Sequence, residues 1–342
     1  MNHLSDLALE ILVKIASKLS VKDVLNLSIC SKHFRNLPFA VKFAKHVKFK
    51  QICKLPYFDS FLSVTFGTSD IEIVFPKKLQ FAYVQNVTLS HLPDSLLYLQ
   101  ISPDYNQPLP FLPASLRSIT LGDYYNYPLL NLPDSLTDLT LGEYYDQLLP
   151  QLPNSLTHFK LGREYNQSFS RLPDSLTRLE LGYYYNQPLP QFPNTLTYLD
   201  LGDNYNQPLP LLPDLLTHLD LGFHYNQPLS QLPSSLKHFV MSALYNKLLP
   251  QLPDSLSYLK LNSIYNQPFQ RLPVSLTYFE CGIYYNQILP SLPESLTELR
   301  LGDFYNQPLP QLPNSLSYLK LGRYHNHPLP QLPDSLTEFV RF

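Results

Sequence analysis

Residues 192–210 read FPNTLTYLDLGDNYNQPLP, and closely similar segments follow one another along most of the chain. Proline occupies every twentieth position from Pro93 to Pro333, in thirteen copies without an insertion or deletion. Leucine occupies the position of Leu96 in all thirteen copies. A fixed period of this length is the sequence signature of a solenoid, in which each repeat forms one coil that stacks on the next.

The centre of each repeat has the spacing of a short β-strand. Leu199 and Leu201 alternate with polar residues, which places both leucines on one face of a strand that follows Leu196. Up to three prolines per repeat, such as Pro193 and Pro208, exclude a regular helix on the return path. The pattern predicts a parallel β solenoid with 20-residue repeats and a non-helical, Pro-rich convex side.

Two further positions recur after the strand. All ten glycines directly follow a strand, and a turn with positive φ is the predicted reason. Because Gly67 obeys this rule, we expect the solenoid to begin near Leu55 with irregular coils. Tyrosine recurs from Tyr105 to Tyr305 and asparagine follows it in most copies, which predicts stacked ladders whose Asn side chains hydrogen-bond neighbouring coils.

The N-terminal residues form a separate segment. Leu7, Ile11 and Ile15 follow helical spacing, and Ser20 with Asp23 predicts a capping box for a second helix. Fewer than about 40 residues rarely build a stable core, so these helices need a partner surface. The alternative is that they cover the open end of the solenoid. The predicted division is a helical domain at 1–40, a linker with degenerate capping coils at 41–92, and the repeat solenoid at 93–342.

The composition indicates a folded intracellular protein. The 342 residues carry a net charge of −2, with ten basic and three acidic residues in 1–54, and fifteen and twenty-four in the remainder. Three cysteines without metal-type spacing favour a reduced compartment. Charges interrupt the first apolar stretch, so neither a signal sequence nor a membrane span is predicted. The expected location is the cytoplasm, with the nucleus as the alternative.

The sequence lacks the common motifs of enzymes and of cofactor-binding sites. It contains no Gly-rich phosphate loop, nucleophile elbow or Cys-His cluster, so we expect no enzymatic activity and no cofactor. The acidic repeats disfavour nucleic acid as a partner. A metal site at His218, His238 and Asp220 is an alternative that no sequence spacing supports.

Both parts of the chain resemble known families. The segment Tyr205-Asn-Gln-Pro208 resembles the FNIP repeat, a relative of leucine-rich repeats, which implies a leucine-rich-repeat-like fold for residues 93–342. The order Leu7-Ala-Leu-Glu-Ile-Leu12, Asp23-Val-Leu25 and Cys30 resembles the F-box, with Ala8 in the place of its usual proline. Together they resemble the F-box and FNIP repeat-containing proteins of social amoebae and of giant viruses that infect amoebae.

This resemblance implies a role in ubiquitination. The head would dock on the Skp-type adaptor of a cullin-RING ligase, and the solenoid would hold an unknown target protein. The adaptor-binding residues it implies are Leu7, Ala8, Leu9, Ile11, Leu12, Ile15, Leu19 and Leu25. The alternative function is an interaction scaffold or host-protein decoy without a ligase.

Two positions in each strand vary between copies and are predicted to face outward on the concave sheet. Variation on a fixed scaffold favours recognition of a target, and neutral drift at exposed positions is the alternative. The predicted target-binding residues are Arg178, Glu180, Tyr198, Asp200, His218, Asp220, His238, Tyr258, Lys260, Tyr278, Arg300 and Tyr318.

Three acidic residues stand on consecutive strands of this face. Glu180, Asp200 and Asp220 would lie roughly 4.8 Å apart, which costs about 1 kcal/mol per pair in water. We therefore expect a target with a basic segment. The chain stops at Phe342, just after the last strand, so we also expect either a weak edge-to-edge dimer or fraying of the last coil.

Overall fold

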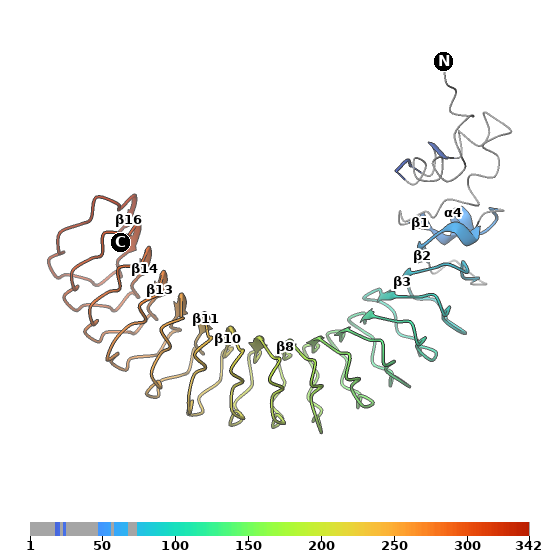
Figure 1. The fold of residues 1–342 in the computed structure, drawn as a ribbon, viewed down its shortest axis with the longest axis horizontal. Helices are drawn as coiled ribbons and strands as arrows, with labels where there is room; N and C mark the ends of the chain where they lie inside the picture. Colours follow the sequence, from blue (N-terminus) through green and yellow to red (C-terminus); the bar gives the residue numbers. More distant parts are fainter. Residues whose placement is uncertain (1–17, 21–22, 25–46, 56–57, 68–73, 342) are drawn as a thin grey trace, which may run out of the picture. The chain divides into compact units, whose positions relative to one another are not determined.

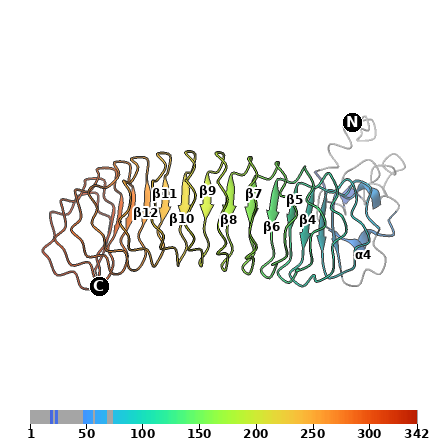
Figure 2. The same ribbon diagram turned by 90° about the horizontal axis from the view of Figure 1, so that it is seen from below.

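The computed structural model of the chain describes residues 18–20, 23–24, 47–55, 58–67 and 74–341. It contains two compact units, Met1–Leu156 and Thr157–Phe342. In each unit, short parallel strands pair in the order of the chain (Figure 1, Figure 2). The predicted parallel β solenoid is confirmed.

The first unit begins with an irregular part and continues into regular coils. Strand β1 precedes a single helical turn, α4, and a 3₁₀ turn, η3, separates them from β2. The elements are β1 (Val47–Lys48), α4 (Phe49–Ile52), η3 (Phe58–Ser60), β2 (Ser63–Phe66), β3 (Phe81–Val84), β4 (Tyr98–Ile101), β5 (Ser118–Thr120) and β6 (Asp138–Thr140).

The second unit consists of regular coils, each with one three-residue strand. Each residue of a strand pairs with the residue 20 positions earlier on the neighbouring strand, so Leu219 lies opposite Leu199. The strands are β7 (His158–Lys160), β8 (Arg178–Glu180), β9 (Tyr198–Asp200), β10 (His218–Asp220), β11 (His238–Val240), β12 (Tyr258–Lys260), β13 (Tyr278–Glu280), β14 (Glu298–Arg300), β15 (Tyr318–Lys320) and β16 (Glu338–Val340).

The core is built from the invariant positions of the repeat. Leu196, Leu199, Leu201 and Tyr205 are fully buried, as are most of their equivalents in other coils. The tyrosines stack on one another, with ring centroids 6.3 Å apart between Tyr205 and Tyr225 and an angle of 3° between their planes. This offset stacking is favourable, and it confirms the predicted tyrosine ladder.

Polar ladders join neighbouring coils at the turns. The Asn186 Oδ1 accepts a hydrogen bond from the backbone N–H of Asn206 at 2.9 Å, and Asn206 accepts one from Asn226 in the same way. The Ser235 hydroxyl donates to the carbonyl oxygen of Leu216 at 2.7 Å. The predicted asparagine ladder is therefore confirmed, and it satisfies backbone groups that the turns leave unpaired.

The glycines follow the strands for a different reason from the predicted one. Among the described residues, positive φ occurs only at Gly202 and Gly222, at 62° and 67°. At Gly302, a Cβ atom would overlap the backbone carbonyl oxygen of Gly282 in the preceding coil. Close contact between coils, rather than a left-handed backbone, explains most of these glycines.

The two ends of the described sheet differ from the regular coils. Strand β1 pairs with β2, so the described part of the sheet already includes Val47, ahead of the predicted start near Leu55. At the other end, Phe339 on β16 is 40% exposed, whereas Phe279 at the same position of β13 is fully buried. Dimerisation or fraying at this end stays a prediction.

Candidate functional site

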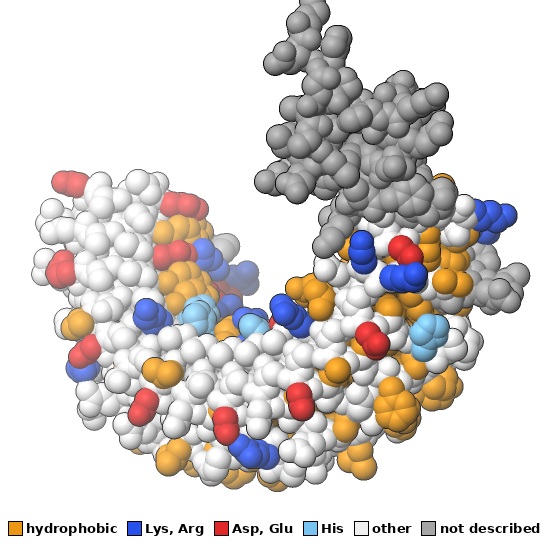
Figure 3. Space-filling model, turned by 45° about the vertical axis from the view of Figure 1, so that its right-hand side comes forward, with side chains coloured by type: hydrophobic (Ala, Val, Ile, Leu, Met, Phe, Trp, Pro, Cys, Tyr) orange, Lys and Arg blue, Asp and Glu red, His pale blue; other side chains and the backbone are white. Residues whose placement is uncertain are grey.

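The candidate site is the inner face, which we define as the outward side chains of strands β7–β16 in the second unit. The strands of this unit lie on the inner side of its curve (Figure 1). In β9 the central Leu199 is buried, while Tyr198 and Asp200 on either side are half-buried. The same pattern recurs in nearly every strand, so the two variable positions point outward as predicted. Basic, histidine and hydrophobic side chains gather there (Figure 3).

An aromatic row runs across five consecutive strands. It consists of Tyr198, His218, His238, Tyr258 and Tyr278, whose successive ring centroids are 5.7, 5.3, 4.0 and 4.3 Å apart. Neighbouring planes differ by 28° or less. The faces of the inner rings therefore cover one another. The Tyr278 hydroxyl donates to Glu280, and the His218 Nδ1 lies 2.9 Å from the Thr217 hydroxyl oxygen.

Arginine side chains occupy both ends of the aromatic row. The Arg178 guanidinium lies 3.6 Å from the ring centroid of Tyr198. At the other end, Arg300 lies 5.8 Å from Tyr278 and 4.7 Å from Tyr318. Both are within the range of cation–π attraction. Tyr318 lies outside the row because the intervening strand carries Glu298 at this position.

Most charges on the inner face are paired within the chain. Glu180 accepts from Arg178 at 2.6 Å and lies 3.1 Å from the Lys160 ammonium. Lys260 lies 3.6 Å from Glu280. Arg300 forms an ion pair with Glu298 and so is also neutralised. The charges of Asp220 and Glu180 both raise the pKa of Asp200, as the expected repulsion requires, but the two cations beside Glu180 offset its share.

Asp200 and Asp220 form a pair of carboxylates without an ion-pair partner among the described residues. They lie opposite each other on β9 and β10. Each Oδ1 accepts the backbone N–H of the glycine two residues later, at 2.9 Å for Gly202 and 2.8 Å for Gly222. Burial raises the pKa of Asp200 to about 6, against the hydrogen bond from Gly202, and it also raises the pKa of Asp220.

A hollow of about 440 Å³ lies beside this carboxylate pair. Its lining includes both carboxylates and Lys260, which is paired with Glu280 and lowers the pKa of Asp220. Three further lining residues are Asp203, Tyr183 and Phe223. The last three residues were not predicted, although each stands in the variable position after a glycine and could have been found there. An open hollow with this lining can bind a charged group.

The described part of the chain offers no cluster of three or more His, Cys, Asp or Glu residues suited to a metal ion. His218 and His238 stack with their rings 5.3 Å apart. Burial lowers the pKa of both, and His218 is further disfavoured as a cation by Arg178 and Lys237. These two imidazoles are therefore part of the aromatic row.

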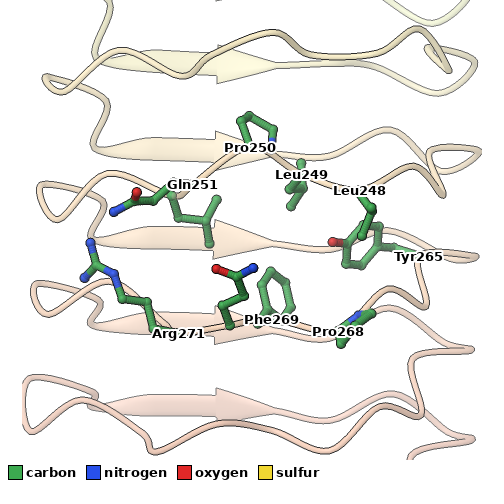
Figure 4. A pocket seen from close by; sticks show the side chains of 10 residues that line it. Leu248, Leu249, Pro250, Gln251, Tyr265, Pro268, Phe269 and Arg271 are labelled. Carbon is green, nitrogen blue, oxygen red and sulfur yellow. The ribbon is translucent and has the colours of Figure 1, made fainter.

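A second cavity lies on the outer wall, where the repeat pattern changes. Phe269 and Gln270 replace the usual leucine and proline, and Phe269 turns toward Tyr265, with ring centroids 5.7 Å apart. The pocket has a volume of about 350 Å³ between two consecutive coils (Figure 4). Its only charged lining residue, Arg271, is paired with Asp254 at 2.5 Å. Sequence reasoning missed this pocket, although the Phe-for-Leu change marks it.

Little of the predicted adaptor-binding head lies in the described residues. The Asp23 backbone N–H donates to the Ser20 hydroxyl at 3.2 Å, which confirms the N-cap of the predicted capping box. Leu19 is 39% exposed. The other adaptor-binding residues lie outside the described residues: Leu7, Ala8, Leu9, Ile11, Leu12, Ile15 and Leu25.

The coils define the class of the protein. It is a leucine-rich-repeat-type solenoid whose parallel sheet exposes one face to solvent. The chain belongs to the FNIP repeat family, and a model of the F-box domain matches residues 4–44. The FNIP Repeat model matches residues 83–124, 105–144, 145–184, 165–204, 185–224, 205–241, 265–304, 285–311 and 305–339.

Solved leucine-rich-repeat structures are similar to this chain. The circular LRR protein CroV588 is 31% identical, with 88% of this chain and 56% of that chain covered and a TM-score of 0.66. YopM from Yersinia enterocolitica is 26% identical, with 83% and 64% covered and a TM-score of 0.68. YopM from Yersinia pestis is 24% identical, with 78% and 84% covered and a TM-score of 0.56.

The chain spans less than two thirds of the length of CroV588 and of the Yersinia enterocolitica protein. A search of curated proteins finds no match to the sequence. Within the described residues, no helix has the length and apolar character that crossing a membrane requires.

Proposed function

We propose that this protein is the substrate-recognition subunit of a Skp/cullin/F-box-type ubiquitin ligase. The observation that carries the proposal is the F-box match at residues 4–44, directly ahead of a repeat solenoid. An F-box with a solenoid of this kind is a protein-interaction module. In this role the head binds the Skp-type adaptor and the solenoid binds the protein to be ubiquitinated.

The inner face supplies the recognition surface in this proposal. Its core positions are fixed, while its outward positions differ from strand to strand, so the scaffold and the contacts are separate. Aromatic and arginine side chains, which are enriched in protein interfaces, occupy the middle of this face. The chain itself performs no chemistry and acts in the cytoplasm or nucleus.

The adaptor-binding head is tested by affinity purification of the tagged full chain followed by mass spectrometry. We expect an adaptor and a cullin to be recovered with the wild-type chain, and both to be lost with Ile11→Asp/Ile15→Asp. The variant Ala8→Pro restores the usual proline of the motif and should recover more adaptor. As the matched control, Leu211→Asp/Leu215→Asp places the same change on two leucines of the solenoid that are 74% and 57% exposed.

The recovered proteins distinguish this function from its rival. Recovery that persists in the Ile11→Asp/Ile15→Asp variant, or that is lost equally in the control variant, would contradict the proposal. Recovery of other proteins with no adaptor or cullin would favour a scaffold or decoy that acts without a ligase.

A further inference from the structure

We infer that the inner face between β9 and β12 binds an extended segment of the target polypeptide that carries neighbouring cationic side chains. The inference rests on the proposed function, because it names the chemistry of the target that the same solenoid would hold.

The charge pattern selects a cation. Glu180 and Glu280 are satisfied by cations of this chain, and Arg300 by an anion of this chain. Asp200 and Asp220 stand between these paired groups, on adjacent strands, with no ion pair to either among the described residues. Their mutual repulsion is relieved by a ligand cation, and the desolvated surroundings strengthen that attraction.

The geometry leaves room for the cations of an extended chain. Each carboxylate uses one oxygen to accept a glycine N–H, and the hollow of about 440 Å³ opens beside both. Neighbouring strands are roughly 4.8 Å apart, and alternate residues of an extended peptide are about 6.6 Å apart. The flexible stems of lysine and arginine span this small difference, so a peptide crossing the strands reaches both carboxylates.

The aromatic row contributes in a different way from an aromatic cage. The inner ring faces are covered by neighbouring rings, and Arg178 occupies the outer face of Tyr198. A ligand therefore meets ring edges, which carry partial positive charge. Such edges suit the backbone carbonyl groups of a peptide, while the two carboxylates select its cationic side chains.

The same groups make binding depend on pH. Burial raises the pKa of Asp200 to about 6, while burial lowers the pKa of His218 and His238. The groups that face these histidines are Tyr198 and Tyr258 in the row, with Arg178 and Lys237. Those that act on Asp200 are Asp220 and Glu180, which raise its pKa, and Lys160, which lowers it. As the pH falls from 7 to 5, Asp200 loses its negative charge, and this loss weakens the binding of a cation.

Fluorescence polarisation with the full chain and a labelled peptide of alternating arginine and serine tests the inference. Peptides with glutamine or glutamate in place of arginine are the reference probes. We expect only the arginine peptide to bind, and Asp200→Asn/Asp220→Asn to weaken its binding about tenfold or more, as loss of interfacial charge pairs does. Asparagine keeps the oxygen that accepts the glycine N–H, so the coils should fold as before, which circular dichroism checks.

The matched control is Asp214→Asn/Asp334→Asn, which removes the same charge from exposed turns between the strands. We expect its affinity for the arginine peptide to equal that of the wild-type chain. Three results would overturn the inference: equal binding of the arginine and glutamine peptides, equal loss in both variants, or binding at pH 5 as tight as at pH 7. Adaptor binding is measured separately, so such a failure would leave the ligase proposal standing.

Discussion

At the scale of single residues, Asp200 and Asp220 change the turn that follows each of them. Each carboxylate accepts the N–H of the glycine two positions later, and these two glycines alone among the described ones have positive φ. The strand residue thus sets the conformation of the turn after it. This link explains why the turns beside the hollow differ from those of the other coils.

Gly302 tests whether close contact, rather than backbone conformation, requires glycine after the strand. We expect Gly302→Ala to lower the free energy of unfolding by about 1–3 kcal/mol, because a Cβ would overlap the carbonyl oxygen of Gly282. Urea denaturation followed by circular dichroism measures the effect. Ser102→Ala is the comparison, since that coil already holds a side chain at the same position of the repeat, and an equal loss in both variants would contradict the account.

His325 takes the place of a tyrosine in the buried ladder and should make the last coils sensitive to acid. Its ring stacks on Tyr305 at 6.0 Å, and both ring nitrogens are buried without a hydrogen-bond partner. Burial lowers its pKa, so protonation favours the unfolded state, and stability is lost as the pH falls below the unfolded value of about 6.5.

The variant His325→Tyr should therefore be more stable than the wild-type chain by about 1 kcal/mol at neutral pH, with a difference that widens toward pH 5. The midpoint of urea denaturation at several pH values measures this. Tyr305→His is the converse variant and should add the same acid sensitivity. A difference between His325→Tyr and wild type that stays constant with pH would show that the histidine does not titrate on unfolding.

At the scale of the coil, the asparagine ladder is one of several rows of hydrogen bonds that join neighbouring coils. Asn186→Ala removes the acceptor of the part-buried Asn206 N–H, and we expect a loss of about 1 kcal/mol in the free energy of unfolding. Asn194→Ala, on an exposed turn, is the control and should change little. Equal values for the two variants would mean that water replaces the ladder without cost.

Most of each coil could be predicted from the sequence because its determinants are local and repeated. The spacing of Leu196, Leu199 and Leu201 predicted the strand and its buried face, and the Tyr-Asn pair predicted both ladders. The close contact at the glycines was missed, since it depends on the distance between coils. The pairing of Glu180 was missed because it depends on how far Arg178 and Lys160 reach from their own positions.

At the scale of the whole molecule, two different kinds of segment are joined in one chain. The repeats bury their leucines against one another and expose a face whose side chains vary, while residues 4–44 match the F-box model. We expect so short a segment to need a partner surface. The period of the repeat predicts the solenoid and the position of its face. The proposed function depends on the N-terminal F-box segment, which lies outside the repeats.

The most direct test of the central claim is the molar mass, by size exclusion with multi-angle light scattering, of the full chain mixed with a purified Skp-type adaptor. The account predicts a one-to-one complex, and it predicts separate species when Ile11→Asp/Ile15→Asp replaces the wild-type chain. A mixture that elutes as two separate proteins, or a complex that survives in the variant, would contradict it.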